Sequence, residues 1–286
     1  MIERLGVVGC GLMGSGIAEV AARHGINVVV SEADPDALKR GQTRLENSLS
    51  RALKASKISE SEFEHARSLI SFASDMGAHF DRQLVVEAIV EDEVAKVAVF
   101  SELDRVVKSE SAILASNTSS IPIMKLGVAT QRPEQVIGIH FFNPVPVLPL
   151  VELVTSLLTS EDVRDSAAEF ASGALGKHVI HSKDRAGFIV NALLIPYILS
   201  AIRMMESGFA TAEDIDTGMV EGCAHPMGPL ALCDLIGLDT TKAVAESLYH
   251  EFKEQLYAPP PLLLRMVEAG LLGRKSGRGF YEYKAR

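Results

Sequence analysis

The sequence of 286 residues is poor in cysteine and contains no long apolar run. Its three cysteines, Cys10, Cys223 and Cys233, form no C-x-x-C pair and cannot all be bridged, so we expect neither a disulfide framework nor a thiolate metal site. No apolar run approaches the roughly 18 to 20 residues that a membrane-spanning helix needs. The first apolar strand begins close to Met1, which leaves no room for a signal or transit peptide. These absences predict a globular protein of the cytoplasm.

Positive charge is also scarce overall. The formal net charge is −9, which argues against nucleic acid or a membrane surface as a partner. One segment departs from this balance. Between residues 39 and 57 a single acid, Glu46, stands among cations, which are Lys39, Arg40, Arg44, Arg51, Lys54 and Lys57. Two interpretations stay open, namely a solvated helix face and a local site for a phosphorylated ligand.

A glycine-rich turn near the N-terminus indicates a dinucleotide site. Residues 4–8 read as a short apolar strand, residues 9–14 have the pattern G-x-G-x-x-G, and a helix-forming stretch follows. In this motif the glycines allow a tight turn, a close approach of backbone to a pyrophosphate, and close packing of the helix on the sheet. A second apolar strand ends at Glu32, whose carboxylate would bind the adenosine ribose hydroxyls and repel a 2'-phosphate. The pattern therefore favours NAD over NADP.

Apolar strands alternate with helical stretches over the first two thirds of the chain, as in an α/β protein with a parallel sheet. We predict a Rossmann-type NAD-binding domain over residues 1–183. The segment 34–68 exceeds an ordinary crossover, so we interpret it as a helical excursion that carries the basic segment. The expected strands are 4–8, 27–31, 69–73, 84–89, 112–115, 136–141 and 150–155, and the expected helices are 13–24, 35–56, 60–68, 92–107 and 161–174.

The pattern changes near Asp184, where strand-like runs stop. We predict an all-α C-terminal domain over residues 184–286, with helices at 188–206, 213–222, 238–252 and 261–268. Pro196 should bend the first of these helices without ending it, because apolar periodicity continues on both sides. That helix has a long apolar face, which contains Ile189, Leu193, Tyr197 and Ile202. A small helical domain cannot cover every such face, so we expect a homodimer through this domain.

A histidine and a glutamate suggest the chemistry. His140 ends the expected strand 136–141, and three prolines make the connection to the next strand stiff, so that Glu152 can return beside the histidine. A carboxylate that is hydrogen-bonded to an imidazole fixes the tautomer of the ring, and it stabilises the imidazolium that forms when the ring takes a proton. Oxidation of a secondary alcohol needs such a base while hydride leaves for a nicotinamide ring. A buried histidine satisfied by a neighbouring acid is the structural alternative.

A polar cluster at residues 115–120, Ala-Ser-Asn-Thr-Ser-Ser, follows another apolar strand. Ligands bind at this edge of such sheets, so the hydroxyls and the amide could contact a substrate or the nicotinamide. Clusters of serine and asparagine also build turns, and the residues alone leave the two interpretations open.

Several motifs in the same order resemble those of the short-chain L-3-hydroxyacyl-CoA dehydrogenase family, particularly its bacterial 3-hydroxybutyryl-CoA dehydrogenases. The resemblance covers nearly the whole chain, and it implies a helical dimerisation domain after the NAD-binding domain. The motifs are Gly9-Cys10-Gly11-Leu12-Met13-Gly14, Val86-Glu87-Ala88-Ile89-Val90-Glu91, Ala115-Ser116-Asn117-Thr118-Ser119-Ser120, His140-Phe141-Phe142-Asn143-Pro144, Leu175-Gly176-Lys177, Gly187-Phe188-Ile189-Val190-Asn191, His225-Pro226-Met227-Gly228-Pro229 and Gly277-Arg278-Gly279-Phe280-Tyr281.

The resemblance also implies residue roles. His140 corresponds to the catalytic base and Glu152 to its partner, with Ser119 and Asn191 around the substrate's oxygen and thioester. Ser48 corresponds to a CoA-contacting serine, and the accompanying lysine is either Lys54 or Lys57 because the local spacing is loose. The positions implied around the cofactor are Gly9, Cys10, Gly11, Leu12, Met13, Gly14, Glu32, Glu91, Lys96, Ser119, Asn143 and Lys275.

The function implied is reversible oxidation of a short-chain L-3-hydroxyacyl-CoA, with 3-hydroxybutyryl-CoA the first candidate, to the 3-oxoacyl-CoA by NAD. Such a step occurs in fatty acid metabolism, including β-oxidation. One alternative is a dehydrogenase of a different 3-hydroxy acid, such as a free sugar acid or a dicarboxylic acyl-CoA; Ser48 and the basic segment favour a CoA ester. The other is a non-catalytic NAD-binding protein, which the presence of both His140 and Glu152 argues against.

Overall fold

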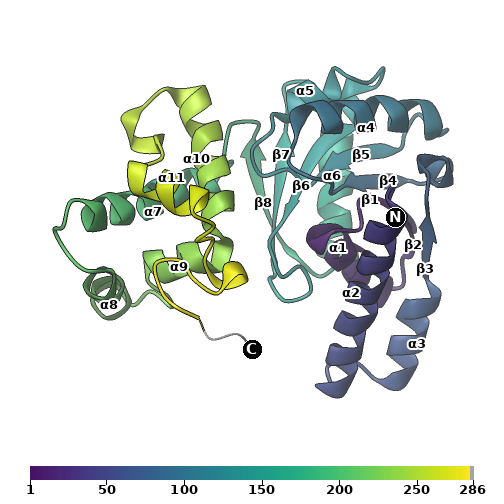
Figure 1. Ribbon diagram of the computed structural model, residues 1–286. Coiled ribbons are helices and arrows are strands. Elements are labelled where there is room, and N and C mark those ends of the chain that lie inside the picture. Colours follow the sequence, from purple (N-terminus) through teal and green to yellow (C-terminus); the bar gives the residue numbers. More distant parts are fainter. Residues whose placement is uncertain (284–286) are drawn as a thin grey trace. The chain divides into compact units, whose positions relative to one another are not determined.

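The computed structural model describes residues 1–283 and divides into two compact units, Met1–Arg185 and Ala186–Arg286 (Figure 1). The first unit contains one eight-stranded sheet with helices, and the second contains helices. The predicted fold class, an α/β Rossmann-type domain followed by an all-α domain, is confirmed.

The sheet of the first unit is mostly parallel. Its strand order is β3-β2-β1-β4-β5-β6-β7-β8, in which only the β6–β7 pair is antiparallel. The carboxyl ends of β1, β2, β4, β5 and β6 therefore meet at one edge, where ligands bind in such sheets. The strands are β1 Arg4–Val8, β2 Asn27–Ser31, β3 Ile70–Ala73, β4 Leu84–Glu87, β5 Ile113–Ser116, β6 Val136–Phe141, β7 Leu150–Thr155 and β8 His178–Lys183.

Helices cover this sheet, and the pair α2–α3 forms the predicted helical excursion, which projects from the rest of the unit (Figure 1). Asp34 caps α2 and Pro35 starts it, while Ser59 and Glu62 form a reciprocal capping box at α3. The helical elements of the unit are α1 Leu12–Arg23, α2 Pro35–Lys54, α3 Glu60–Ser68, η1 Met76–His79, α4 Glu93–Val106, α5 Ile123–Gly127, η2 Pro133–Gln135, α6 Glu161–Glu169 and η3 Phe170–Ala174.

The central strands are buried along their whole length. Every residue of β4, β5 and β6 is buried, as expected for strands covered by helices on both faces. This is why they are recognisable in the sequence as continuous apolar runs. Leu5, Val7, Ile17 and Val28 belong to the same core, which joins α1 to the sheet that carries the glycine-rich turn.

Two details of the first unit differ from the sequence prediction. Strand β8 was missed, because the segment His178–Lys183 pairs only with β7 at the edge of the sheet and mixes polar with apolar side chains. The helix expected over 161–174 is α-helical only to Glu169 and continues as a π-helical turn from Phe170 to Ala174. Neither difference alters the edge of the sheet that faces a ligand.

A fully buried histidine beneath the sheet makes the first unit sensitive to acid. His79 accepts or donates one hydrogen bond, between Nε2 and Ser31 Oγ at 2.7 Å, and within the described residues its Nδ1 has no hydrogen-bond partner. Burial, followed by the charge of Arg82, lowers the pKa of His79 from 6.5 to about 4. In the folded state the imidazole of His79 therefore stays neutral at a pH at which it binds a proton in the unfolded state. The stability that the neutral His79 contributes is fully present above pH 6.5, and it is lost as the pH falls toward 4.

We expect the free energy of unfolding to fall by about 2 kcal/mol between pH 7.5 and pH 5 through this group alone. His79→Gln, which cannot titrate, should remove that part of the loss, whereas His65→Gln on the exposed face of α3 should keep it. Urea titrations followed by circular dichroism at both pH values measure the difference. An equal loss in wild type and His79→Gln would contradict the assignment.

The second unit packs its helices around a separate apolar core that includes Ile198, Leu230, Leu248 and Leu263. Helix α7 continues through Pro196, as predicted. Helix α9 was missed because its residues are apolar at nearly every position apart from Asp234, so that they show no helical period. The elements are α7 Val190–Glu206, α8 Ala212–Cys223, α9 Pro229–Ile236, α10 Leu238–Phe252, η4 Gln255–Tyr257, α11 Pro261–Glu268 and η5 Arg274–Ser276.

The apolar face predicted for the first helix of this unit is split by the structure. Ile202 is fully buried in the unit's own core and Tyr197 packs against that core, whereas Leu193 is 74% exposed. Ile189 precedes the helix. The prediction of one continuous apolar face over all four residues was therefore wrong, because the core of the second unit itself covers Tyr197 and Ile202.

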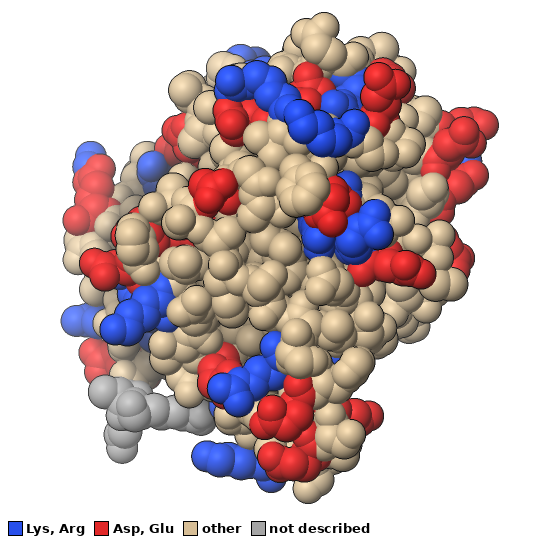
Figure 2. Space-filling view, turned by 90° about the vertical axis from the view of Figure 1, so that its right-hand side faces the viewer, with Lys and Arg blue, Asp and Glu red and all other residues tan. Residues whose placement is uncertain are grey.

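Within residues 1–283, no helix is both long and apolar enough to cross a membrane. Charged side chains of both signs are interspersed over the face shown in Figure 2. No broad patch of lysine and arginine is visible on that face.

Candidate active site

His140 and Glu152 lie directly opposite each other on adjacent strands. Strands β6 and β7 pair antiparallel with His140 in register with Glu152, and His140 Nδ1 lies 2.7 Å from Glu152 Oε2. Both side chains are buried, and the ring of Phe142 contacts the imidazole at a centroid distance of 4.5 Å. The spacing of twelve residues in the sequence thus becomes a direct cross-strand pair.

This pair has the geometry of an oriented base. A neutral imidazole that donates its Nδ1 proton to Glu152 carries its lone pair on Nε2, and the buried carboxylate stabilises the ring when Nε2 takes up a proton. His140 stands near the carboxyl end of β6, the edge at which the ligand site of such a sheet forms. The arrangement can therefore exchange a proton with a ligand at that edge.

The glycine-rich turn has the three steric features that a dinucleotide site needs. Gly9 has a φ of +100°, and a Cβ on Gly14 would lie 1.9 Å from the carbonyl oxygen of Gly9. A Cβ on Gly11 would meet no protein atom within 4 Å, which leaves that side of the backbone open for a ligand. The N-terminus of α1 follows at Leu12, so its unpaired N–H groups suit a pyrophosphate.

A cavity of about 760 Å³ adjoins this turn and is lined by Gly9, Gly11, Leu12, Met13, Glu32 and neighbouring residues. Glu32 is half-buried, and its Oε2 accepts a hydrogen bond from Cys10 N at 3.2 Å. Cys10 itself is buried beneath the turn, and burial raises the pKa of its thiol to about 11. The cavity, the open side of Gly11 and the carboxylate together fit an NAD molecule.

The open side of Gly11 gives a direct test of this fit. Gly11→Ala should leave the fold intact, because its φ of −69° suits any residue, but the added methyl should weaken NADH binding at least about 10-fold by keeping the pyrophosphate away. Gly218→Ala on α8, where a Cβ also meets nothing, is the matched control and should bind NADH normally. Fluorescence titration measures both; unchanged affinity in Gly11→Ala would rule out this approach of the cofactor.

Glu91 organises the polar cluster that follows β5. Its Oε1 accepts hydrogen bonds from Thr118 Oγ1 at 2.5 Å and from the backbone N–H groups of Ser119 and Ser120 at 2.9 and 3.1 Å. Burial by itself would raise the pKa of Glu91, but Lys96 and these hydrogen bonds outweigh it and lower the pKa. The cluster is therefore a turn held by a carboxylate, with the half-buried Ser119 placed at the ligand edge of the sheet.

Glu87, for which the sequence predicted no role, lies at the centre of this network. Lys96 Nζ lies 2.6 Å from Glu87 Oε1 and 3.3 Å from Glu91 Oε2, and Ser116 donates to Glu87 Oε2 at 2.6 Å. Lys96 is only 1% exposed, so its ammonium joins the two carboxylates. An acid at the end of the apolar run 84–87, followed by a lysine nine residues later, was the signal available in the sequence.

Two asparagines occupy different places around the strand that carries His140. Asn117 Oδ1 accepts a hydrogen bond from Phe141 N at 2.9 Å and so ties the turn after β5 to β6. Asn143 is exposed and begins the connection from β6 to β7, two residues after the last residue of β6. Only Asn143 was among the predicted cofactor residues, and its exposure leaves its amide accessible to a ligand.

The predicted CoA residues lie on the helical excursion. Ser48 is a half-buried residue of α2 and hydrogen-bonds Glu19 of α1, whose pKa is raised chiefly by burial. Lys54 ends α2 and Lys57 follows it in the turn toward α3, and both side chains are exposed. The structure favours neither lysine as the partner of a phosphate.

Asn191 and Lys275, the other predicted site residues, belong to the second unit. Asn191 is half-buried in the first turn of α7. Lys275 Nζ lies 2.5 Å from Asp239 Oδ1, and both groups are partly exposed. Within its own unit, Lys275 is therefore already engaged in an ion pair.

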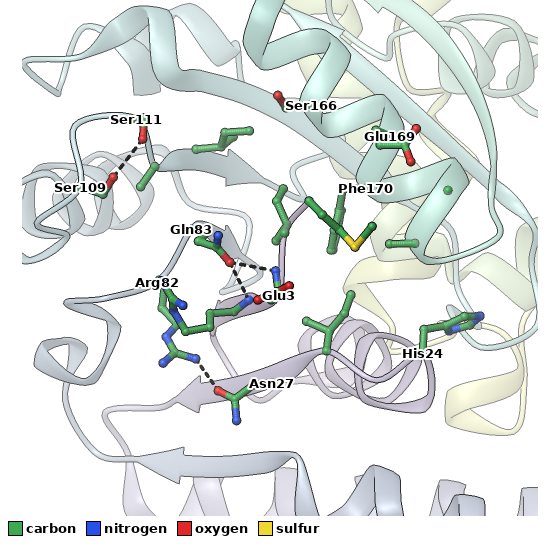
Figure 3. A pocket seen from close by; sticks show the side chains of 18 of the residues that line it. Glu3, His24, Asn27, Arg82, Gln83, Ser109, Ser111, Ser166, Glu169 and Phe170 are labelled. Atoms are coloured by element: carbon green, nitrogen blue, oxygen red, sulfur yellow. Dashed lines mark hydrogen bonds between the residues drawn. The ribbon is translucent and has the colours of Figure 1, made fainter.

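Another hollow of the first unit, about 1280 Å³, lies at the opposite, amino edge of the sheet. Figure 3 shows the hydrogen bond from Arg82 to Asn27 and the hydrogen bond that the side chain of Gln83 accepts from Glu3 N. None of the predicted site residues lines this hollow. Some of its polar groups pair with one another, as Ser109 does with Ser111, and it carries none of the features that we expect of the cofactor site.

Comparisons with known proteins agree with this geometry. The family model described as "3-hydroxyacyl-CoA dehydrogenase, NAD binding domain" matches residues 4–185, and "3-hydroxyacyl-CoA dehydrogenase, C-terminal domain" matches residues 187–283. A 3-hydroxybutyryl-CoA dehydrogenase of Mycobacterium tuberculosis is 59% identical over 282 residues, which are 99% of each chain.

Solved structures give the same result. The crystal structure of M. tuberculosis FadB2 matches with a TM-score of 0.98 and 59% identity over 99% of both chains. That of the (S)-3-hydroxybutyryl-CoA dehydrogenase PaaH1 from Ralstonia eutropha matches with a TM-score of 0.93 and 44% identity over 100% of both chains.

Proposed function

The chain belongs to the 3-hydroxyacyl-CoA dehydrogenase family, and on that premise we propose that it oxidises (S)-3-hydroxybutyryl-CoA, the L form, reversibly to acetoacetyl-CoA with NAD. The family resemblance stated from the sequence is confirmed, as is NAD as the cofactor. The observation that carries the proposed chemistry is the 2.7 Å contact between His140 and Glu152 at the ligand edge of the NAD-binding sheet.

In the proposed mechanism, His140 Nε2 accepts the proton of the substrate's 3-hydroxyl group. Glu152 keeps the imidazole oriented through Nδ1 and stabilises the positive charge that develops on it. The glycine-rich turn and Glu32 would hold NAD, which would supply the acceptor for the hydride of the carbon that bears this hydroxyl group. In the reverse direction His140 returns the proton to the oxygen of the ketone.

Further residues of the chain would position the substrate and the cofactor. Ser119, fixed by its backbone bond to Glu91, is our candidate for a contact with the substrate's oxygen and with the nicotinamide. Asn191 is our candidate for the thioester, and Asn143 and Lys275 for the cofactor. Lys96 would act through Glu91, because its ammonium is buried between carboxylates.

A CoA ester rather than a free acid is supported by the basic segment on α2. The exposed Lys54 and Lys57, together with Ser48, offer hydrogen-bond donors and positive charge to the phosphates of CoA in an otherwise acidic protein. The relatives at 59% and 44% identity are named for 3-hydroxybutyryl-CoA, which supports a short acyl chain.

The first test is the fall in absorbance at 340 nm with acetoacetyl-CoA and NADH, compared with NADPH and with free acetoacetate. We expect a rapid fall only with NADH and the CoA ester. Activity on the free acid would favour a dehydrogenase of a different 3-hydroxy acid. A folded protein that binds NADH but turns over no acyl-CoA of any chain length would favour a non-catalytic NAD-binding protein.

We also propose a homodimer formed through the second unit, and a cytoplasmic location. Leu193 and Phe209 are 74% and 79% exposed on this unit, and a partner would remove such apolar surface from water. All three cysteines are unpaired, as is usual in a reducing compartment. Sedimentation at micromolar concentration tests the dimer, and a single species near 30.8 kDa would contradict it.

A further inference from the structure

The wall of the NAD cavity contains a second acid besides Glu32. Asp75 follows β3, the strand that pairs with β2, and it lines the same cavity as Glu32. The two strands end in register, with Ser31 opposite Ala73, and Glu32 N donates to Ala73 O at 3.2 Å. The acids thus stand one and two residues beyond paired strand ends, on the adenosine side of the cavity.

The two carboxylates have different local partners. Glu32 is tied to the glycine-rich turn through Cys10 N at 3.2 Å, whereas Asp75 Oδ1 accepts a hydrogen bond from Gly77 N at 2.8 Å and caps the short helix η1. The bonds from Cys10 and Gly77 are backbone bonds that neutralise neither charge. Asp75 is exposed, so its charge acts on a ligand through solvent-screened electrostatics.

Cations near this wall are engaged elsewhere. The residues that line the cavity include no lysine or arginine within the described part of the chain. On α2, Arg40 pairs with Asp34 at 3.6 Å, and Arg44 Nη1 donates to the carbonyl oxygen of Cys10 at 3.0 Å. The cavity wall itself is therefore doubly acidic.

We propose that Asp75 is a second specificity-determining residue, which acts with Glu32 to reject dinucleotides that carry a phosphate on the adenosine ribose. The inference rests on the cofactor site described above and extends it. Ribose hydroxyls can donate to carboxylates, whereas a 2'-phosphate brings up to two negative charges to the same wall. Replacing Glu32 alone would then leave part of the preference for NADH over NADPH in place.

Asp75→Asn removes the negative charge and preserves the local structure. Asparagine is as good a helix cap as aspartate, and its side-chain oxygen can still accept the hydrogen bond from Gly77 N. Dissociation constants for NADH and NADPH would be measured by fluorescence titration and competition. We expect NADPH to bind about 5-fold more tightly and NADH to change less than about 2-fold, because an exposed charge pair has an effect of this size. Raising the salt concentration should shrink the gain for NADPH.

Glu32→Gln and the double variant complete the experiment. The double variant should bind NADPH more tightly than either single variant. Asp165→Asn removes one charge from α6, outside the cavity wall, and should leave the NADPH to NADH ratio unchanged. Equal changes for NADH and NADPH in Asp75→Asn, or a change of ratio in Asp165→Asn as large as in Asp75→Asn, would overturn the proposal. A wild-type protein that binds no NADH would instead refute the cofactor site itself.

Discussion

Replacement of His140 by glutamine is expected to lower kcat by about 1000-fold while the affinity for NADH stays within about 2-fold of wild type. General base catalysis by a positioned side chain contributes about 100- to 10000-fold, and glutamine cannot take the proton. Glu152→Gln should lower kcat by about 100-fold or more, because the amide neither fixes the imidazole tautomer nor stabilises the charged ring. Steady-state kinetics with acetoacetyl-CoA and NADH measure both effects.

His181→Gln is a suitable control, since His181 is an exposed histidine on β8 of the same sheet. It should retain wild-type kcat. Because His140 and Glu152 act as a unit, the double variant should be scarcely slower than His140→Gln alone. Full activity in His140→Gln would remove His140 from the mechanism, and additive losses would show that the two residues act independently.

Replacement of Asp234 by alanine is expected to destabilise the second unit by about 3 kcal/mol or more. Asp234 is buried in α9, and its carboxylate accepts hydrogen bonds from Phe280 N, Tyr281 N and the Tyr283 hydroxyl, each at 2.9 Å. Alanine would leave these donors without their acceptor, and each buried unsatisfied group costs about 1 to 3 kcal/mol. The segment 280–283 would lose the hydrogen bonds that join it to α9.

Tyrosine fluorescence can follow this unit alone. All five tyrosines lie beyond residue 186 and the chain has no tryptophan, so urea unfolding monitored in this way reports the second unit. Asp234→Asn keeps one acceptor oxygen and should lose less stability than the alanine variant. Glu246→Ala, which removes a partly exposed ion pair with Lys242, should change stability by less than about 1 kcal/mol. Similar midpoints for Asp234→Ala and Glu246→Ala would contradict the proposed attachment.

Much of the fold could be predicted from the sequence, because buried parallel strands appear as continuous apolar runs. The bounds of β1, β2, β6, β7, α3, α10 and α11 match the prediction. The missed elements lack that signal. Strand β8 has a neighbour on one side only and needs few apolar residues, and α9 is apolar at nearly every position and so shows no helical period.

Those residues of the candidate site that have a distinctive side chain or a glycine motif could be predicted from the sequence. His140, Glu32 and the glycines stand out at or near strand ends, and the structure places Glu152 inside β7 opposite His140. Contacts between distant segments were not visible. The burial of Lys96 between two acids depends on how α4 packs beside β4, which the residue spacing alone does not specify.

The antiparallel pairing of β6 and β7 separates the acid–base pair from the loop that connects the two strands. The backbone register sets His140 opposite Glu152, one residue pair away from Phe141 and Val151, where the ladder meets the connection at 142–149. An insertion in that connection that preserves this register would leave His140 and Glu152 paired. A shift of the register by one residue would turn one partner to the other face of the sheet. The chemistry therefore depends on a strand alignment that permits no slippage.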